Sequence, residues 1–307
     1  MLSVAALTPS LDLTYLLPSL ALGQIHRTSD VVRCAGGKSL NMARAATTVG
    51  AATQVVALLG GNTGDMLAAM LRTEGLSVTE VRSPGETRTC VSIASAEPPG
   101  LTEVYEEAPA VPAGVWQEYR TTLEAAVAGS TGWLSISGRA PLGLDDGLAE
   151  LVRAGMRNGL RVAVDTHGAA LPGAVRERPA LVKVNRVEAA ELLAVSPGTA
   201  LLTMADAVQE RTGGTVVLTD GAAGALAVDG ERALAAGAPQ VTGAYPVGSG
   251  DSFLGGLLAA LDRGADLADA LRLGMACGVA NALVPGQGYF ALADADQIAA
   301  QVAISTL

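Results

Sequence analysis

The chain has 307 residues, half of them hydrophobic and only 3% aromatic, so aliphatic side chains must fill a core large enough for one large α/β domain or two ordinary ones. Its formal net charge of −10 argues against a general nucleic-acid-binding surface, and any phosphorylated ligand therefore needs local positive charge. No stretch reaches the roughly 18 apolar residues of a membrane span, and the short apolar start lacks the basic region of a secretory signal. The three cysteines form neither a zinc pattern nor a disulfide framework, so we expect a cytoplasmic protein with reduced thiols that binds neither nucleic acid nor membrane.

The first hundred residues mix buried segments with half-exposed ones. Strands are expected at 1–7 and 53–59, and helices at 39–49 and 65–73. Polar residues recur at every second or third place, as in strands with one wet face, at 11–17, 24–34, 87–94 and 101–106. Because a sheet covered on both faces has no place for them, we expect these four segments to form a small second sheet that projects from the main one.

After Pro112 the predicted helices and strands alternate regularly. The expected helices are 113–127, 143–157, 187–193, 204–212, 251–261 and 267–283. The expected strands are 133–137, 161–165, 180–184 and 215–219. This alternation predicts an α/β fold with a doubly wound, mostly parallel sheet covered on both faces. No repeat or low-complexity linker interrupts it, so we expect 1–307 to form a single domain, with the small sheet built from segments near 11–34 and 87–106.

The strongest local signal is Gly248-Ser249-Gly250-Asp251, at the start of a predicted helix. Two glycines let the backbone approach a ligand closely, and the free N–H groups of a helix start point at an anion. A carboxylate repels phosphate, but it is useful here if Asp251 takes a proton from a hydroxyl while the N–H groups hold the transferring phosphoryl group. The alternative is that Asp251 is only an N-cap residue.

A second glycine pair, Gly36-Gly37, precedes Lys38 and Asn41 at the start of another predicted helix. The segment is not a P-loop, because that motif needs a glycine five positions before Gly37, where Val32 stands. It can still bind a polar or anionic ligand. The alternative is a tight turn followed by a solvated lysine.

Asn185 and Glu188 follow the predicted strand 180–184 at a spacing that puts both on one side of a helix's first turn. The carboxyl ends of strands are where open α/β sheets bind ligands, and oxygen donors there suit Mg²⁺. The alternative is a helix cap with a solvated glutamate. The chain has only two histidines, which disfavours a histidine-dependent catalytic triad. No G-x-G-x-x-G follows the first strand, which argues against dinucleotide binding in the usual position.

Taken in this order, these segments resemble the ribokinase-like (PfkB-type) carbohydrate kinase family over nearly the whole chain. The segments 36–37 and 247–252 look like its two signatures, and 185–188 looks like its N-x-x-E metal motif. Finer features are similar to the branch that holds 1-phosphofructokinase and tagatose-6-phosphate kinase, at 8–12, 23–27, 36–44, 87–88, 137–141 and 165–168. Ser39, Arg139 and Val184 depart from that branch, where Gly, Ser and Pro are usual.

The resemblance implies an ATP-dependent, Mg²⁺-requiring kinase that phosphorylates a hydroxymethyl group of a ketohexose monophosphate. Asp251 would be the base, with Gly248, Ser249 and Gly250 forming the anion hole. The implied substrate-binding residues are Asp12, Gly36, Gly37, Asn41 and Ser137 around the sugar, and Arg27, Lys38 and Arg88 around its phosphate. Arg139 could add a phosphate contact or block the usual pose. The implied nucleotide-binding residues are Asn185, Thr219, Gly221, Gly224 and Asn281, and Asn185 and Glu188 would organise Mg²⁺ through water.

The resemblance also implies that the small sheet is a lid, which in this family often pairs with a second lid to make a homodimer. Two alternatives remain. A kinase for an unphosphorylated sugar or nucleoside is disfavoured by the cations Arg27, Lys38 and Arg88, which a neutral substrate does not need. A non-catalytic sugar- or nucleotide-binding regulator is disfavoured by the intact Asp251.

Overall fold

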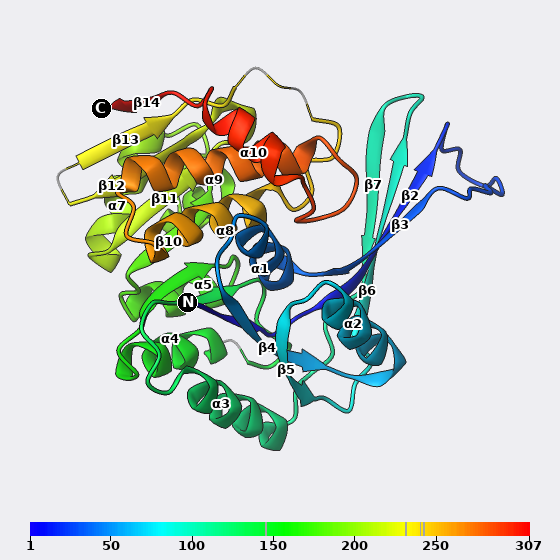
Figure 1. Cartoon of the computed structure of the whole chain (residues 1–307), viewed down its shortest axis with the longest axis horizontal. Helices are drawn as coiled ribbons and strands as arrows, with labels where there is room; N and C mark the ends of the chain where they lie inside the picture. The colour runs from blue at the N-terminus through cyan, green and yellow to red at the C-terminus, as the bar shows by residue number, and fades with distance from the viewer. Residues whose placement is uncertain (145, 231, 240, 242) are drawn as a thin grey trace.

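The computed structural model describes residues 1–307 apart from 145, 231, 240 and 242. A large sheet lies between two layers of helices, and a small sheet projects from one side (Figure 1). The large-sheet strands, in spatial order, are β14 (Ile304–Thr306), β13 (Arg232–Ala236), β12 (Ala225–Asp229), β11 (Thr215–Thr219), β10 (Leu181–Asn185), β9 (Arg161–Asp165), β8 (Trp133–Ser137), β1 (Leu2–Ala6), β4 (Thr53–Leu59) and β5 (Ser77–Arg82). The strands from β11 to β5 are parallel, and β12, β13 and β14 form an antiparallel edge. The predicted doubly wound, mostly parallel sheet is confirmed.

Apolar side chains alternate between the two faces of the large sheet, as a sheet covered on both sides requires. Along β1 and the residue after it, Val4 and Ala6 belong to one core cluster, and Ala5 and Leu7 belong to the other. The helices on the Val4 side are α1 (Lys38–Thr48), α2 (Gly61–Thr73), α8 (Ser249–Asp262), α9 (Leu267–Ala282) and α10 (Leu292–Ala299). Those on the other face are α3 (Ala113–Val127), α4 (Gly147–Arg157), α5 (Ala170–Arg176), α6 (Arg186–Leu193) and α7 (Leu201–Thr212).

The small sheet has the order β3 (Val31–Gly36), β2 (Ser10–Leu17), β6 (Arg88–Ser95) and β7 (Gly100–Tyr105), as the half-exposed pattern predicted. Two antiparallel pairs meet where β2 runs parallel to β6. The strand expected at 24–34 is wrong in its first part, because β3 begins only at Val31. In the register of this pair, Tyr15 lies opposite Val31. Only two residues of β2 remain beyond Tyr15 before Pro18 ends the strand, so β3 has almost no partner strand ahead of Val31.

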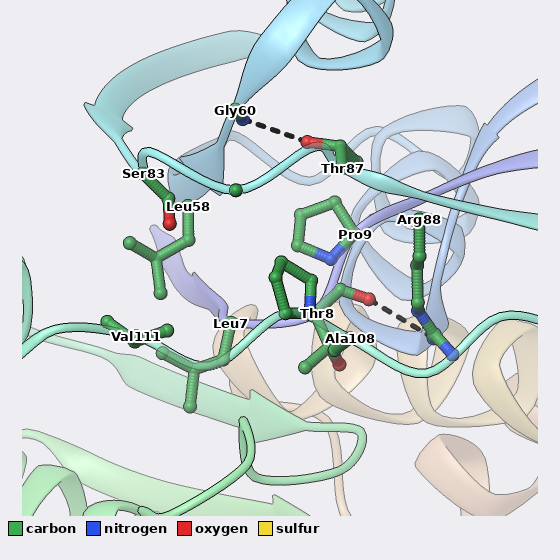
Figure 2. A pocket seen from close by; sticks show the side chains of 12 residues that line it. Leu7, Thr8, Pro9, Leu58, Gly60, Ser83, Thr87, Arg88, Ala108 and Val111 are labelled. Atoms are coloured by element: carbon green, nitrogen blue, oxygen red, sulfur yellow. Dashed lines mark hydrogen bonds between the residues drawn. The ribbon is translucent and has the colours of Figure 1, made fainter.

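The small sheet is anchored where β2 and β6 leave the large one (Figure 2). Arg88 donates to the carbonyl of Thr8 (3.2 Å), and the Gly60 N–H donates to Thr87 Oγ1 (2.9 Å). A small cavity of about 20 Å³ remains beneath this junction. The contacts fix the start of β2, and with it Asp12, relative to the end of β1.

Several short elements were missing from the sequence prediction: β5, α5, β12, β13, α10 and β14. Two of these elements show why the sequence did not predict them. β5 is an edge strand whose side chains are mostly exposed, and α5 is a seven-residue helix that contains Pro172, so neither has a clear apolar period. Within the described residues, no helix is long and apolar enough to cross a membrane.

Candidate active site

The candidate site lies where the chain order of the large sheet reverses, between β1 and β8. Open α/β sheets bind ligands in the crevice outside the strand ends at such a point. Residues after both strands lie there, since a Cβ on Gly138 would be 3.4 Å from Thr8 Oγ1 and 3.8 Å from Lys38 Cβ. The start of α1 therefore lies at the same edge.

The start of α8 is an open anion-binding end. Its N-cap, Gly248, has a left-handed φ of 83°, and no side chain of the described residues caps the helix. A Cβ there would lie 2.9 Å from Gln287 Cβ, so only glycine fits. In the described part of the chain, the N–H groups of Gly250 and Asp251 donate to no oxygen. They are free to bind a phosphoryl oxygen.

Asp251, in the first turn of α8, is buried with a raised pKa. Burial is the largest cause of the rise, and Lys38 opposes it. Asp251 Oδ2 accepts a hydrogen bond from Asn41 Nδ2 at 2.9 Å. Asn41 Oδ1 is buried and has no partner among the residues that the structure describes, so it can accept a bond from a ligand hydroxyl beside the carboxylate.

Asp12 approaches the same place from β2. Ser10 Oγ donates to Asp12 Oδ1 at 2.6 Å, and a Cβ on Gly36 would lie 2.0 Å from Asp12 Oδ2. The glycine pair thus makes room for a carboxylate, and Gly37, with φ 97°, is the N-cap of α1. Burial raises the pKa of Asp12 to about 6.

Two lysines share one carboxylate next to Asp251. Asp165, at the end of β9, is fully buried, with Lys38 Nζ 2.9 Å from Oδ1 and Lys183 Nζ 3.0 Å from Oδ2. Burial alone would raise the pKa of Asp165, but Lys183 and Lys38 lower it. Burial alone would lower the pKa of Lys38, but Asp165, Asp251 and Glu188 raise it. Lys38 is therefore cationic.

Sequence reasoning missed Lys183. The available signal was a lysine among the apolar residues Leu181, Val182 and Val184 of one strand, where an unpaired charge is costly. Lys183 Nζ is 2.9 Å from the position that a Cβ on Gly250 would occupy, so its ammonium lies directly at the start of α8. Together with Lys38 it supplies the local positive charge that an anion needs in an acidic protein.

The residues predicted to hold a substrate phosphate separate into three places. Arg88 donates to the carbonyl of Thr8, and the Thr8 hydroxyl donates to the main-chain carbonyl of Arg139 (3.4 Å). The exposed guanidinium of Arg139 pairs with Glu107 (3.4 Å). Lys38 lies with Asp165 instead. Arg27 is exposed in the loop between β2 and β3. Figure 1 shows this loop at the projecting end of the small sheet, away from the end of β6 at which Arg88 stands.

Asn185 and Glu188 form a capping box at the start of α6. Asn185 Oδ1 accepts from the Glu188 N–H (2.9 Å), and Glu188 Oε2 accepts from the Asn185 N–H (2.8 Å). The helix-cap alternative is thus present in the structure. The cap also directs Glu188 Oε1 toward Lys38 Nζ, 3.7 Å away. Among the residues that the structure describes, no three His, Cys, Asp or Glu side chains cluster as a metal site.

A cavity of about 350 Å³ leads to the start of α8. Three predicted nucleotide-site residues line it, Thr219, Gly221 and Gly224, together with Ser249 and Gly250 of the predicted anion hole. Most other lining groups are apolar, which suits a flat base. Asn185 and Asn281 are not among the lining residues.

Asn281 is fully buried and holds the start of α8 instead. Its Nδ2 donates to the Val247 carbonyl (2.8 Å) and to Ser249 Oγ (3.2 Å). Its Oδ1 accepts from Ser252 Oγ (3.2 Å) and from the Gly288 N–H (2.7 Å). The turn into α8 is therefore fixed from inside the protein.

Ser137 is buried at the end of β8 and is joined to the start of α1 through its carbonyl. Ser39 Oγ donates to the carbonyls of Ser137 (2.7 Å) and Ala5 (3.0 Å). A serine in place of the usual glycine thus ties α1 to β8 and β1. The structure gives no reason for Val184 in place of proline.

Comparison with known proteins places this geometry in a family. Residues 5–293 match the pfkB family of carbohydrate kinases. The chain is 31% identical over 281 residues to a 1-phosphofructokinase of Rhodobacter capsulatus, which covers 90% of this chain and 88% of the relative.

Solved structures agree. Phosphofructokinase-2 of Escherichia coli, in complex with potassium, superposes with a TM-score of 0.90 at 26% identity, covering 97% of this chain and 98% of that one. A possible 1-phosphofructokinase of Thermotoga maritima has the same fold, with a TM-score of 0.89 at 18% identity over 100% of this chain and 99% of that one. The chain belongs to the pfkB family and is a carbohydrate kinase of the phosphofructokinase type.

Proposed function

We propose that this kinase transfers the γ-phosphoryl group of ATP to a hydroxymethyl group of a ketohexose monophosphate, giving the bisphosphate. The observation that carries the proposal is Asp251, a buried carboxylate in the first turn of α8, with two lysines beside it. At this helix start the N–H groups of Gly250 and Asp251 donate to no oxygen of the described residues. A carboxylate and an anion-binding end together suit deprotonation of a hydroxyl next to a transferring phosphoryl group. Neither feature alone requires this chemistry.

The residues divide the reaction as follows. Asp251 accepts the proton of the acceptor hydroxyl, and that oxygen bonds to the γ-phosphorus as the bond to the β-phosphate oxygen breaks and ADP leaves. Asn41 and Asp12 orient the sugar hydroxyls from two sides. Gly248, Ser249 and Gly250 are proposed to form the anion hole. The Ser249 N–H donates to the Pro246 carbonyl (3.1 Å), so the N–H groups of Gly250 and Asp251 are those available to the phosphoryl oxygens. Lys38 and Lys183 offset the charge on the transferring group.

A phosphate already on the sugar is proposed to bind Arg88, which donates to Thr8 at the base of the small sheet, and Arg139, whose exposed guanidinium would exchange Glu107 for the phosphate. Lys38, initially expected there, is better placed for the transferring phosphoryl group. The 1-phosphofructokinase relative favours fructose 1-phosphate as substrate, and the complex of the E. coli neighbour with fructose 6-phosphate favours that isomer. Tagatose 6-phosphate is the third member of this substrate class.

Mg²⁺ fits the edge of the sheet at Asn185 and Glu188. Asn185 is the last residue of β10, and Glu188 lies in the first turn of α6. Glu188 Oε1 is left outside the capping box, so it can accept a metal-bound water. Bound there with the nucleotide, Mg²⁺ would neutralise phosphate charge. Asn185 and Glu188 are proposed to hold its water shell in place.

The small sheet is proposed to be the lid of a single kinase domain and the dimer interface. Exposed apolar groups support this: Val104 and Tyr105 on β7, and Leu22 and Ile25 in the loop that carries Arg27. The E. coli neighbour is described in a tetrameric inhibited form. Light scattering at micromolar concentration should give a dimer mass, and a monomer there contradicts the proposal. A cytoplasmic location is part of the same proposal.

The substrate assignment is tested by kcat/KM with ATP and Mg²⁺ for fructose 1-phosphate, fructose 6-phosphate and tagatose 6-phosphate, against fructose, ribose and adenosine. We expect a ketohexose monophosphate to be preferred and a bisphosphate to form. Preference for a free sugar or a nucleoside would favour a kinase for an unphosphorylated substrate. Arg139 would then be the first residue to suspect of blocking the usual substrate pose. If the protein binds these compounds but turns over none of the six, a non-catalytic sugar- or nucleotide-binding regulator is favoured.

A further inference from the structure

Arg44 lies on α1, three residues after Asn41. It is buried, 5% exposed, in a part of the molecule where a cation needs several partners. Its Nε donates to Glu74 Oε2 (2.8 Å), at the end of α2, and its guanidinium lies 4.3 Å from the centre of the Tyr289 ring. Tyr289 in turn donates to Glu74 Oε1 (2.5 Å). These contacts anchor the side chain.

The remaining donors of Arg44 join two separate segments. Nη2 donates to the carbonyl of Ala35 (2.6 Å), in β3 of the small sheet, and Nη1 donates to the carbonyl of Gln287 (3.0 Å). Ala35 immediately precedes the glycine pair that accommodates Asp12. A single rigid fork therefore ties the sugar-binding end of the small sheet to the loop 286–289.

That loop is packed against the start of α8. Gln287 Cβ lies 2.9 Å from the place of a Cβ on Gly248, and the Gly288 N–H donates to Asn281, which holds Val247 and Ser249. A Cβ on Gly288 would lie 2.7 Å from the carbonyl of Asn41, whose side chain donates to Asp251. Both halves of the phosphoryl-transfer geometry, the anion-binding end and the base, therefore rest on this loop.

We infer that Arg44 is a positioning residue that sets the loop 286–289, and through it the anion-binding start of α8, relative to the small sheet. The inference rests on the proposed function, since it assigns Arg44 to the same transfer site. A purely structural Arg44 would stabilise the fold without affecting the transfer step selectively. A positioning residue, by contrast, affects kcat, because small displacements of groups that bind the transition state are costly to the rate.

The test is Arg44→Lys, which keeps the charge opposite Glu74 but loses the planar fork that reaches both carbonyls. The matched control is Arg263→Lys. Arg263 also donates to a carbonyl, that of Val49 (2.9 Å), but at the far end of α8. We expect Arg44→Lys to lower kcat about ten- to hundred-fold with the KM for ATP within threefold, and Arg263→Lys to keep kcat within twofold. A kcat within twofold of wild type in Arg44→Lys, or an equal fall in both variants, overturns the inference.

Hydrogen exchange gives a readout that does not depend on activity. Peptides covering 247–252 and 286–289 should exchange faster in Arg44→Lys than in Arg263→Lys, and equal exchange overturns the inference even if the wild type proves inactive on every sugar tested. Failure of the proposed function is thus distinguishable from failure of the inference about Arg44. If Arg44→Lys does not fold, Gly288→Ala displaces the same loop with Arg44 intact. It should reproduce the fall in kcat, and a wild-type kcat in that variant contradicts the inference.

Discussion

Asp12→Asn should make the protein more stable and less active. Asp12 is 8% exposed, and burial is the main reason that its pKa rises from an ordinary 3.8 to about 6. The folded protein therefore holds this proton more tightly than the unfolded chain does. The stability that the protonated form provides is complete below about pH 4 and is lost as the pH rises through about 6.

The size of the loss follows from the two pKa values. A difference of one pH unit corresponds to about 1.4 kcal/mol, so the ionised carboxylate costs the fold about 3 kcal/mol above pH 6. Asparagine removes this cost and keeps an acceptor for Ser10, but its amide group does not replace a carboxylate that accepts from the Gly37 backbone. We therefore expect a net gain of about 1–2 kcal/mol at pH 7.5, and a smaller gain at pH 5.5.

Urea unfolding at the two pH values measures the gain, and steady-state kinetics measure the loss of function. Losing a charged acceptor for a sugar hydroxyl should raise the KM for the sugar phosphate about ten- to hundred-fold. Asp30→Asn, which replaces an exposed carboxylate beside the same small sheet, is the control and should change neither quantity. A less stable Asp12→Asn with the wild-type pH dependence refutes the burial argument, and an unchanged KM refutes the sugar-binding role.

Other substitutions separate the remaining roles. Lys183→Met should lower kcat about ten- to hundred-fold, because it removes one of the two cations at the start of α8, while the KM for the sugar phosphate changes little; the reverse pattern contradicts its placement. Glu188→Gln should raise the Mg²⁺ concentration needed for the half-maximal rate, and an unchanged Mg²⁺ titration would leave Glu188 with only its role in the capping box. Arg139→Ala should raise the KM for the sugar phosphate about ten-fold and leave the KM for ATP unchanged, whereas a lower KM would mean that Arg139 obstructs the substrate.

The parts of the site that the sequence revealed are those with a local signal. Gly248 to Asp251 could be recognised because glycines and a carboxylate at a helix start have a distinct chemistry, and Asn41 and Gly37 sit in a similar segment. The small sheet was predicted because half-exposed strands cannot lie inside a covered sheet. In each case a few neighbouring residues carry the information.

The rest depends on contacts between distant segments. Asp165 lies 127 residues from Lys38, and only the folded sheet shows that it also binds Lys183. Arg27 sits in a segment that resembles the family, but the exposed loop takes it away from Arg88. Asn281 was expected to bind the nucleotide, yet its four bonds go to the protein. Long-range packing of this kind leaves no period or spacing in the sequence.

The most direct test of the central claim is product formation by Asp251→Asn, with ATP, Mg²⁺ and the preferred ketohexose monophosphate, followed by mass spectrometry. The account predicts that the wild type forms the bisphosphate. It also predicts that Asp251→Asn remains folded and binds ATP with a KM within threefold, but forms the product about 10²–10⁴-fold more slowly. Turnover at the wild-type rate in Asp251→Asn would contradict the assignment of Asp251 as the base.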